Sequence, residues 1–116
     1  MPTISKGRAC LTLINVFTVS PENQDELIAL LTEVTERTIR HHRGFISASL
    51  HRSLDGRKVT MYAQWASMDD YEAMRRDSRS APSLRKALEF AKFDPGMYEV
   101  AEIFVPDPQH APAAQQ

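Results

Sequence analysis

The stretch FISASLHRSLDGRKVTMYAQW (residues 45–65) places two strand-like runs on either side of an Asp-Gly pair. Asp-Gly between alternating apolar residues is a strong signal for a β-hairpin. A two-residue turn at this pair places Leu50 opposite Met61 and Ile46 opposite Trp65. One face of the hairpin is then apolar, and its members are Ile46, Ala48, Leu50, Val59, Met61, Ala63 and Trp65. The other face is mixed and begins with Phe45.

The sequence on both sides of the hairpin predicts the order β-α-β-β-α-α-β. Alternating or β-branched runs predict strands at 9–19, 45–53, 58–66 and 97–105. Apolar residues at helical spacing predict helices at about 21–42, from Ser67 onward and at about 81–92. This order is typical of a ferredoxin-like α+β fold, in which helices cover one face of a four-stranded antiparallel sheet. We expect one domain at 9–105, an N-terminal arm at 1–8 and a flexible tail at 106–116.

The second face of this sheet needs a partner. It carries side chains such as Ile14, Val16 and Tyr62, which are too apolar to remain in water over a wide area. Two sheets packed face to face bury such residues. The sequence therefore predicts a homodimer with a barrel-like interior.

Composition excludes several functional classes. The formal net charge of −1 gives no electrostatic support for a nucleic acid or an anionic membrane as partner. No apolar run approaches the ~20 residues that a membrane span needs, and the N-terminus does not resemble a signal peptide. The single cysteine, Cys10, suits a small buried side chain. These features are typical of a cytoplasmic protein.

The sequence also lacks the common catalytic motifs. No cluster of Cys, His, Asp or Glu has the spacing of metal ligands, and there is neither a Gly-rich phosphate loop nor a G-x-S-x-G nucleophile motif. His51 is either a general base or a residue packed at the surface or at a dimer interface near the hairpin. The pair at 41–42 lies at a helix end, where positive charge interacts favourably with the helix dipole.

The only tryptophan, Trp65, stands at the end of a strand, just before the helix that starts at Ser67. It either plugs the end of the core or forms a wall of a cavity under that helix. We expect the cavity, roofed by the two later helices and lined by apolar side chains, namely Phe17, Met61, Met74, Leu84 and Leu88.

Three segments, NVFTVSPENQDELIALLTE, HHRGFISASLHRSLDG and VTMYAQWASMDDYEAM, together resemble the antibiotic biosynthesis monooxygenase family. The resemblance covers about residues 10–105. It implies the dimeric α+β barrel fold and, in the best-known members, oxidation of phenolic rings of aromatic polyketides to quinones by molecular oxygen, with no cofactor.

The resemblance also implies site residues. The positions that match the polar pocket of the quinone-forming members are Asn15, Trp65, Tyr71 and Arg85. Met61 departs from the pattern, because those members carry an asparagine four residues before the tryptophan. Haem-degrading relatives need a histidine about ten residues after the tryptophan, where this chain has Arg75.

Two readings of function follow. The first is a cofactor-independent monooxygenase for a planar phenol, in which Trp65 stacks on the ring, Asn15 and Tyr71 orient its oxygens, and Arg85 offsets the charge of the phenolate. The second is a non-oxygenase protein on the same dimeric scaffold that binds a small hydrophobic metabolite or serves in a stress response. Met61 favours the second reading, because it makes the pocket poorer in hydrogen bonds. A purely structural dimer module predicts no cavity beside Trp65.

Overall fold

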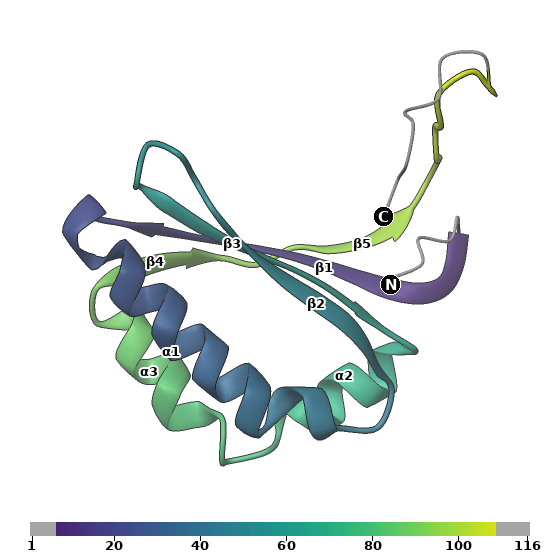
Figure 1. Ribbon diagram of the computed structural model, residues 1–116. Coiled ribbons are helices and arrows are strands. Elements are labelled where there is room, and N and C mark those ends of the chain that lie inside the picture. Colours follow the sequence, from purple (N-terminus) through teal and green to yellow (C-terminus); the bar gives the residue numbers. More distant parts are fainter. Residues whose placement is uncertain (1–6, 109–116) are drawn as a thin grey trace.

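The computed structural model describes residues 7–108, and it is an antiparallel sheet with helices on one face (Figure 1). The strands are β1 (Gly7–Val19), β2 (Phe45–Arg52), β3 (Lys58–Trp65), β4 (Ala91–Asp94) and β5 (Met97–Val100). The helices are α1 (Gln24–Arg37), α2 (Met68–Arg75) and α3 (Ala81–Leu88), with single 3-10 turns η1 (Pro21–Asn23) and η2 (Ile39–His41) at the two ends of α1. The expected α+β, ferredoxin-like architecture is confirmed. Most of the predicted arm and tail lies outside the described residues.

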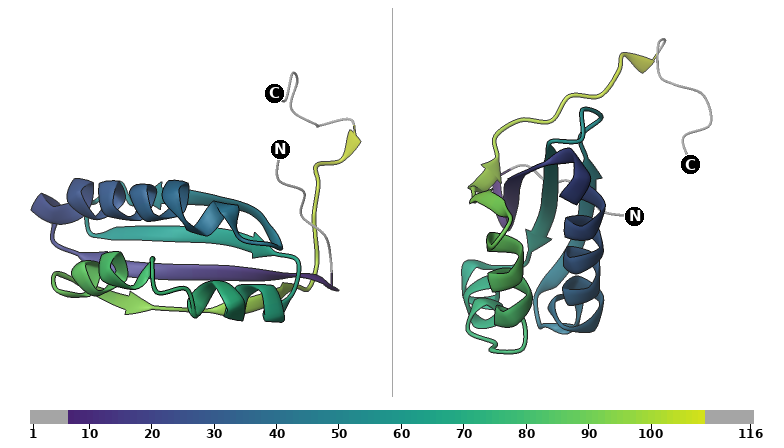
Figure 2. Two further views of the ribbon diagram at one scale, coloured as in Figure 1. Left: turned by 90° about the horizontal axis from the view of Figure 1, so that it is seen from below. Right: turned by 90° about the vertical axis from the view of Figure 1, so that its left-hand side faces the viewer.

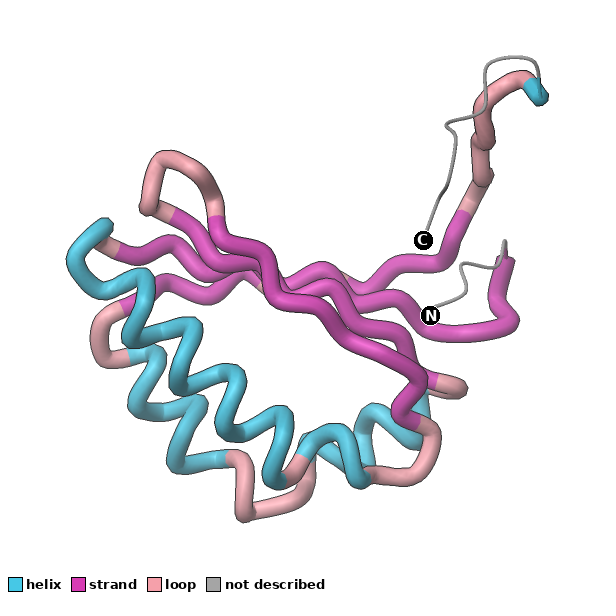
Figure 3. The backbone as a smooth tube through the Cα atoms, viewed as in Figure 1, coloured by secondary structure: helices cyan, strands magenta, loops and turns pink. Residues whose placement is uncertain are grey.

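The sheet has the strand order β2-β3-β1-β4, and β5 pairs with β1 on the same side as β4. Figure 2 shows α1 running along one side of the helical layer, with α2 and α3 following each other along the other side. Figure 3 shows that, within the described residues, the opposite sheet face carries no helix. The helices therefore cover only one face of the sheet.

The last third of the chain differs from the sequence prediction. The third helix ends at Leu88 rather than at 92, and 91–94 form a strand, so the sheet has five strands instead of four. The last strand is shorter than the expected 97–105, since β5 ends at Val100. The ring of Phe93 stacks on that of Phe17, with centroids 4.7 Å apart, and this cross-strand pair favours the extended conformation. Pro95 has no N–H to donate, so the edge strand is interrupted where it passes β1.

The hairpin register is confirmed for most of its length, since Leu50 pairs with Met61. The expected two-residue turn is wrong, because β2 ends at Arg52, β3 begins at Lys58, and the N–H of Gly56 donates to the Ser53 carbonyl within a longer loop. The expected pairing of Ile46 with Trp65 is wrong. A bulge between 45 and 47 places Phe45 opposite Trp65, on the helix-covered face, and leaves Ile46 46% exposed. The bulge turns the larger aromatic ring, which is half-buried, toward the side of the sheet that the helices cover, where it removes more apolar surface from water than isoleucine would.

The core consists of two separate clusters along the sheet. The first contains Phe17, Val19, Leu27, Leu31, Val59 and Ala87. The second contains Leu13, Ala63, Trp65 and Tyr71. The first cluster joins α1 and α3 to the sheet, and the second joins α2 to it.

Replacing Leu27 with alanine should lower the free energy of unfolding by about 2–5 kcal/mol, because this fully buried side chain leaves a cavity in the first cluster. Chemical denaturation measures the change. The matched control is Leu54→Ala in the hairpin loop, where the leucine is fully exposed and the change should be close to zero. Equal effects of the two substitutions would contradict the position of the core.

Candidate functional site

Asn15 lies between the two core clusters. On the helix-covered face of β1 its neighbours are Leu13 of the second cluster and Phe17 of the first, and its cross-strand partner on β3 is Met61. Its Oδ1 accepts a hydrogen bond from the backbone N–H of Gly96, at 3.4 Å, where the edge strand is interrupted. Its Nδ2 has no hydrogen bond in the described part of the chain, so it can donate to a ligand.

A cleft of about 140 Å³ opens to solvent between α1 and β2, next to this point. Its lining residues are Thr32, Thr35, Glu36, Ala48, Ser49, Leu50 and Met61. The hydroxyl of Thr35 is buried and has no hydrogen-bond partner. A buried polar group without a partner is costly, so this hydroxyl is a place where a ligand oxygen could bind. Sequence reasoning missed Thr35, although it follows Leu31 by one helical turn on the inward side of α1.

Trp65 is 1% exposed and does not line this cleft. The rings of Phe45 and Tyr71 meet the indole in edge-to-face geometry, with centroid distances of 5.4 and 6.0 Å. In this conformation the indole is therefore packed as a core residue, and a substrate can contact it only if one of these rings moves.

Tyr71 is buried on α2, one turn after the cap in which the Ser67 hydroxyl accepts the backbone N–H of Asp70. This cap confirms the helix start predicted from the sequence. Burial raises the pKa of the Tyr71 phenol above its usual value, so the hydroxyl remains protonated at neutral pH and can donate a hydrogen bond. The guanidinium of Arg75 lies 6.0 Å from the centre of the ring.

The structure brings together only part of the predicted site. Trp65, Tyr71 and the half-buried Met74 belong to the second cluster, and Asn15 faces Met61. Phe17 is buried in the first cluster. The remaining three residues lie exposed on α3, and they are Leu84, Arg85 and Leu88.

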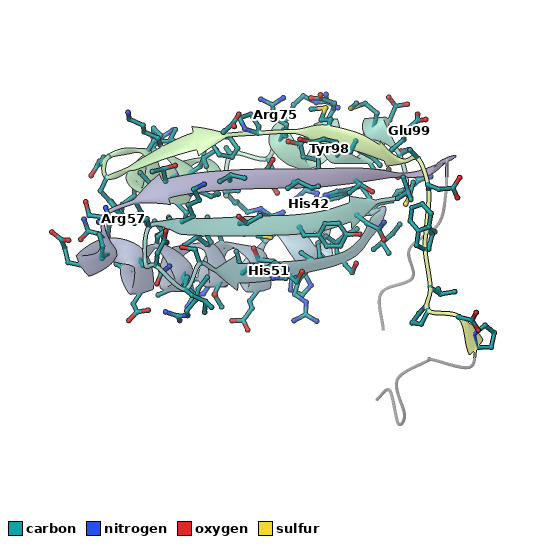
Figure 4. All side chains as sticks on the ribbon, turned by 90° about the horizontal axis from the view of Figure 1, so that it is seen from above. His42, His51, Arg57, Arg75, Tyr98 and Glu99 are labelled. Atoms are coloured by element: carbon teal, nitrogen blue, oxygen red, sulfur yellow. The ribbon has the colours of Figure 1, made fainter. Side chains whose placement is uncertain are left out.

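The histidines have partners that the sequence did not reveal. His42 Nε2 lies 2.8 Å from Asp77 Oδ2, across the gap between the α1–β2 and α2–α3 connections. Hydrogen bonds from the Arg79 side chain, and then from its backbone, hold the pKa of Asp77 far below its usual range. His51 Nε2 lies 2.9 Å from the Ser49 hydroxyl on the open sheet face. Figure 4 looks onto that face, with His51 along one edge and Tyr98 along the other.

Among the described residues, no group of three or more His, Cys, Asp or Glu side chains could hold a metal ion. Among the same residues, no helix is both long and apolar enough to cross a membrane.

The chain is similar to known proteins over most of its length. The family model for antibiotic biosynthesis monooxygenase matches residues 10–81. Tetracenomycin-F1 monooxygenase from Streptomyces glaucescens is 44% identical over 104 residues, which cover 90% of this chain and 93% of that protein.

Two solved structures extend the comparison. A monooxygenase from the gene ActVA-Orf6 of Streptomyces coelicolor, in complex with nanaomycin D, is 28% identical with a TM-score of 0.72, covering 86% of this chain and 95% of that chain. SnoaB from Streptomyces nogalater, described as a cofactor-independent oxygenase, is 20% identical with a TM-score of 0.67, covering 85% and 99%. At that identity SnoaB supports the fold alone.

Tyr71 should ionise at a higher pH than a free phenol, because burial disfavours its charged form. Since the folded protein holds this proton more tightly, the stability due to Tyr71 is present below about pH 10 and is lost as the pH rises further. Ultraviolet absorbance of the phenolate measures the titration. Tyr71→Phe should remove the part of the absorbance change that appears above about pH 10. The denatured chain serves as the control, because no burial raises the pKa of Tyr71 there. Loss of a component at or below pH 10 would contradict the burial of Tyr71.

Proposed function

The chain belongs to the antibiotic biosynthesis monooxygenase family, and from this premise we propose that it oxidises a planar phenol to a quinone with molecular oxygen and without a cofactor. The observation that carries the proposal is the 44% identity to tetracenomycin-F1 monooxygenase over nearly the whole of both chains. The nanaomycin D bound by a related monooxygenase supports a small, flat aromatic substrate.

The proposed reaction needs no metal or flavin, because the substrate itself supplies the electrons. Loss of the phenolic proton gives a phenolate, which passes one electron to dioxygen. The resulting phenoxyl radical and superoxide combine at the para carbon, and protonation gives a hydroperoxide. The para carbon then loses its hydrogen as a proton while the O–O bond breaks. One oxygen stays as the quinone carbonyl and the other leaves as water.

The protein positions the ring and stabilises the anion in this scheme. The free Nδ2 of Asn15 and the protonated hydroxyl of Tyr71 donate hydrogen bonds to substrate oxygens, and the Trp65 indole stacks on the ring. Arg85 offsets the phenolate charge by turning inward from α3 when substrate is bound, which a long side chain without an ion pair in the described residues allows.

The size of the cleft constrains this proposal. Pockets that enclose drug-sized ligands occupy about 300–1,000 Å³, whereas the cleft beside Met61 has about 140 Å³. A three-ring phenol therefore needs additional space, which a movement of the Phe45 ring away from Trp65 would supply while Tyr71 stays in place to donate its hydrogen bond.

Met61 favours a second candidate function, the binding of a small hydrophobic metabolite without oxidation. Its thioether side chain faces Asn15 and lines the cleft, where it offers no strong hydrogen bond. Met61→Asn discriminates the two functions. Oxygenase activity that appears only in this variant would support the second candidate.

The purified protein, freed of metals and flavin, should consume oxygen when supplied with an anthrone under air. Asn15→Ala should slow this reaction about tenfold or more, because one hydrogen bond to the developing anion is lost. An oxygen electrode and absorbance of the quinone measure the rate. Asn23→Ala is the matched control, since the Asn23 side chain makes no capping hydrogen bond. No uptake above the uncatalysed rate with several phenols would refute the proposal.

We also propose a homodimer formed through the open sheet face. Ile14, Val16 and Tyr62 are only partly buried there. The segment after β5 runs away from the body of the protein (Figure 1). It carries a bulky apolar residue, Phe104, that is exposed to solvent. A second copy would cover these groups.

Sedimentation should therefore give twice the 13.1 kDa mass of one chain. A double substitution, Val16→Asp with Tyr62→Glu, should shift the protein to monomers, because it places charges on the open face. Leu54→Glu, in the hairpin loop, is the control that should stay dimeric. A monomeric parent protein would rule out this interface.

A further inference from the structure

The α2 helix covers the indole of Trp65 but has little apolar anchorage of its own. It has eight residues, and among them only Tyr71 is buried. The other large apolar residues of α2 are exposed or half-buried, namely Met68 and Met74. Burial of one ring does not fix the position of a two-turn helix, so other contacts must hold α2 against the sheet.

Those contacts come from residues 42–44, which connect α1 to β2. The Gly44 carbonyl accepts a hydrogen bond of 2.7 Å from the N–H of Ala66, immediately before α2. Gly44 has a φ of +85°, and a Cβ at this position would lie 2.2 Å from Asp70 Oδ2. The α2 helix therefore approaches this connection closely, and a side chain at 44 would push it away.

The strongest polar contact across this gap joins His42 to Asp77, at 2.8 Å. Their side chains are only 18% and 11% exposed, so water competes little for the bond. Asp77 is itself fixed by two sets of bonds. Its backbone N–H donates to the Met74 carbonyl in the last turn of α2, and its carboxylate accepts three side-chain hydrogen bonds from Arg79, at 3.0, 3.1 and 2.6 Å. A second pair, Arg43 with Asp70, is 3.9 Å apart and mostly exposed, so it adds little.

We propose that His42 and Asp77 are positioning residues for the proposed oxidation, because their hydrogen bond holds α2 in place and so sets Tyr71 on the Trp65 indole. Breaking this bond lets α2 move away from the sheet and uncovers the indole beside the cleft. The inference rests on the proposed function for its catalytic meaning, whereas the movement of α2 can be measured without any substrate.

Quenching of tryptophan fluorescence by acrylamide tests the movement, since Trp65 is the only tryptophan in the chain. His42→Ala removes the bond and Asp77→Asn removes its negative charge, so the population with an uncovered indole should rise in both variants, roughly tenfold in His42→Ala, and the quenching constant with it. His42→Gln should behave like the parent protein, because its amide N–H can replace the Nε2–H donor. Far-UV circular dichroism confirms that each variant is folded, and Asp77→Asn provides the answer if His42→Ala does not fold.

A matched control breaks an ion pair far from α2. Asp25 of α1 pairs with Arg52 of β2, and Asp25→Asn should leave the quenching constant unchanged. Equal quenching in the parent, His42→Ala and Asp77→Asn would overturn the inference, as would an equal rise in Asp25→Asn.

Kinetics separate the inference from the proposed function. If an anthrone is oxidised, His42→Ala should lower kcat about tenfold with a smaller effect on KM, because Tyr71 is misplaced in the complex, and His42→Gln should restore it. A kcat that is unchanged in His42→Ala would overturn the positioning role. If no form of the protein oxidises any phenol but the quenching differences appear, the proposed function fails while the role of His42 and Asp77 in holding α2 stands.

Discussion

The structure depends on covering one apolar face of a twisted sheet with helices. The inner side chains of β1 and β3 pair across the centre of this face, and every helix packs on it. In the middle of β1 the apolar pattern is broken by Asn15, whose amide needs hydrogen bonds that a dry core cannot supply. The core consequently divides into two clusters, and the cleft at the α1–β2 edge opens near this division.

The sequence predicts the fold well wherever local patterns decide it. Alternation and the Asp-Gly pair were enough to predict the hairpin register at Leu50, and the Ser67 cap was enough to predict the start of α2. The prediction fails where distant residues decide the structure. The bulge beside Ile46 depends on how Phe45 meets Trp65, and the strand at 91–94 depends on Phe17. Neither partner is close in sequence, and periodicity alone does not identify them.

The candidate site, too, could be predicted from the sequence only where local patterns decide it. Sequence spacing and family resemblance bring Trp65 and Tyr71 together correctly, because a strand end followed by a capped helix leaves few alternatives. Thr35 and the His42–Asp77 bond were missed. A threonine on a mostly aliphatic helix face has no distinctive motif, and a bond between two connections depends on how the helices are arranged in space.

The bulge in β2 has a consequence for solubility. β2 is an edge strand, and the outward N–H and C=O groups of such a strand can pair with the edge of any other chain. An irregular stretch at one end of the strand prevents a long, flat ladder, and the charged Arg52 marks the other end. The same local distortion that turns Phe45 toward the helices therefore also protects the protein from open-ended aggregation through this edge.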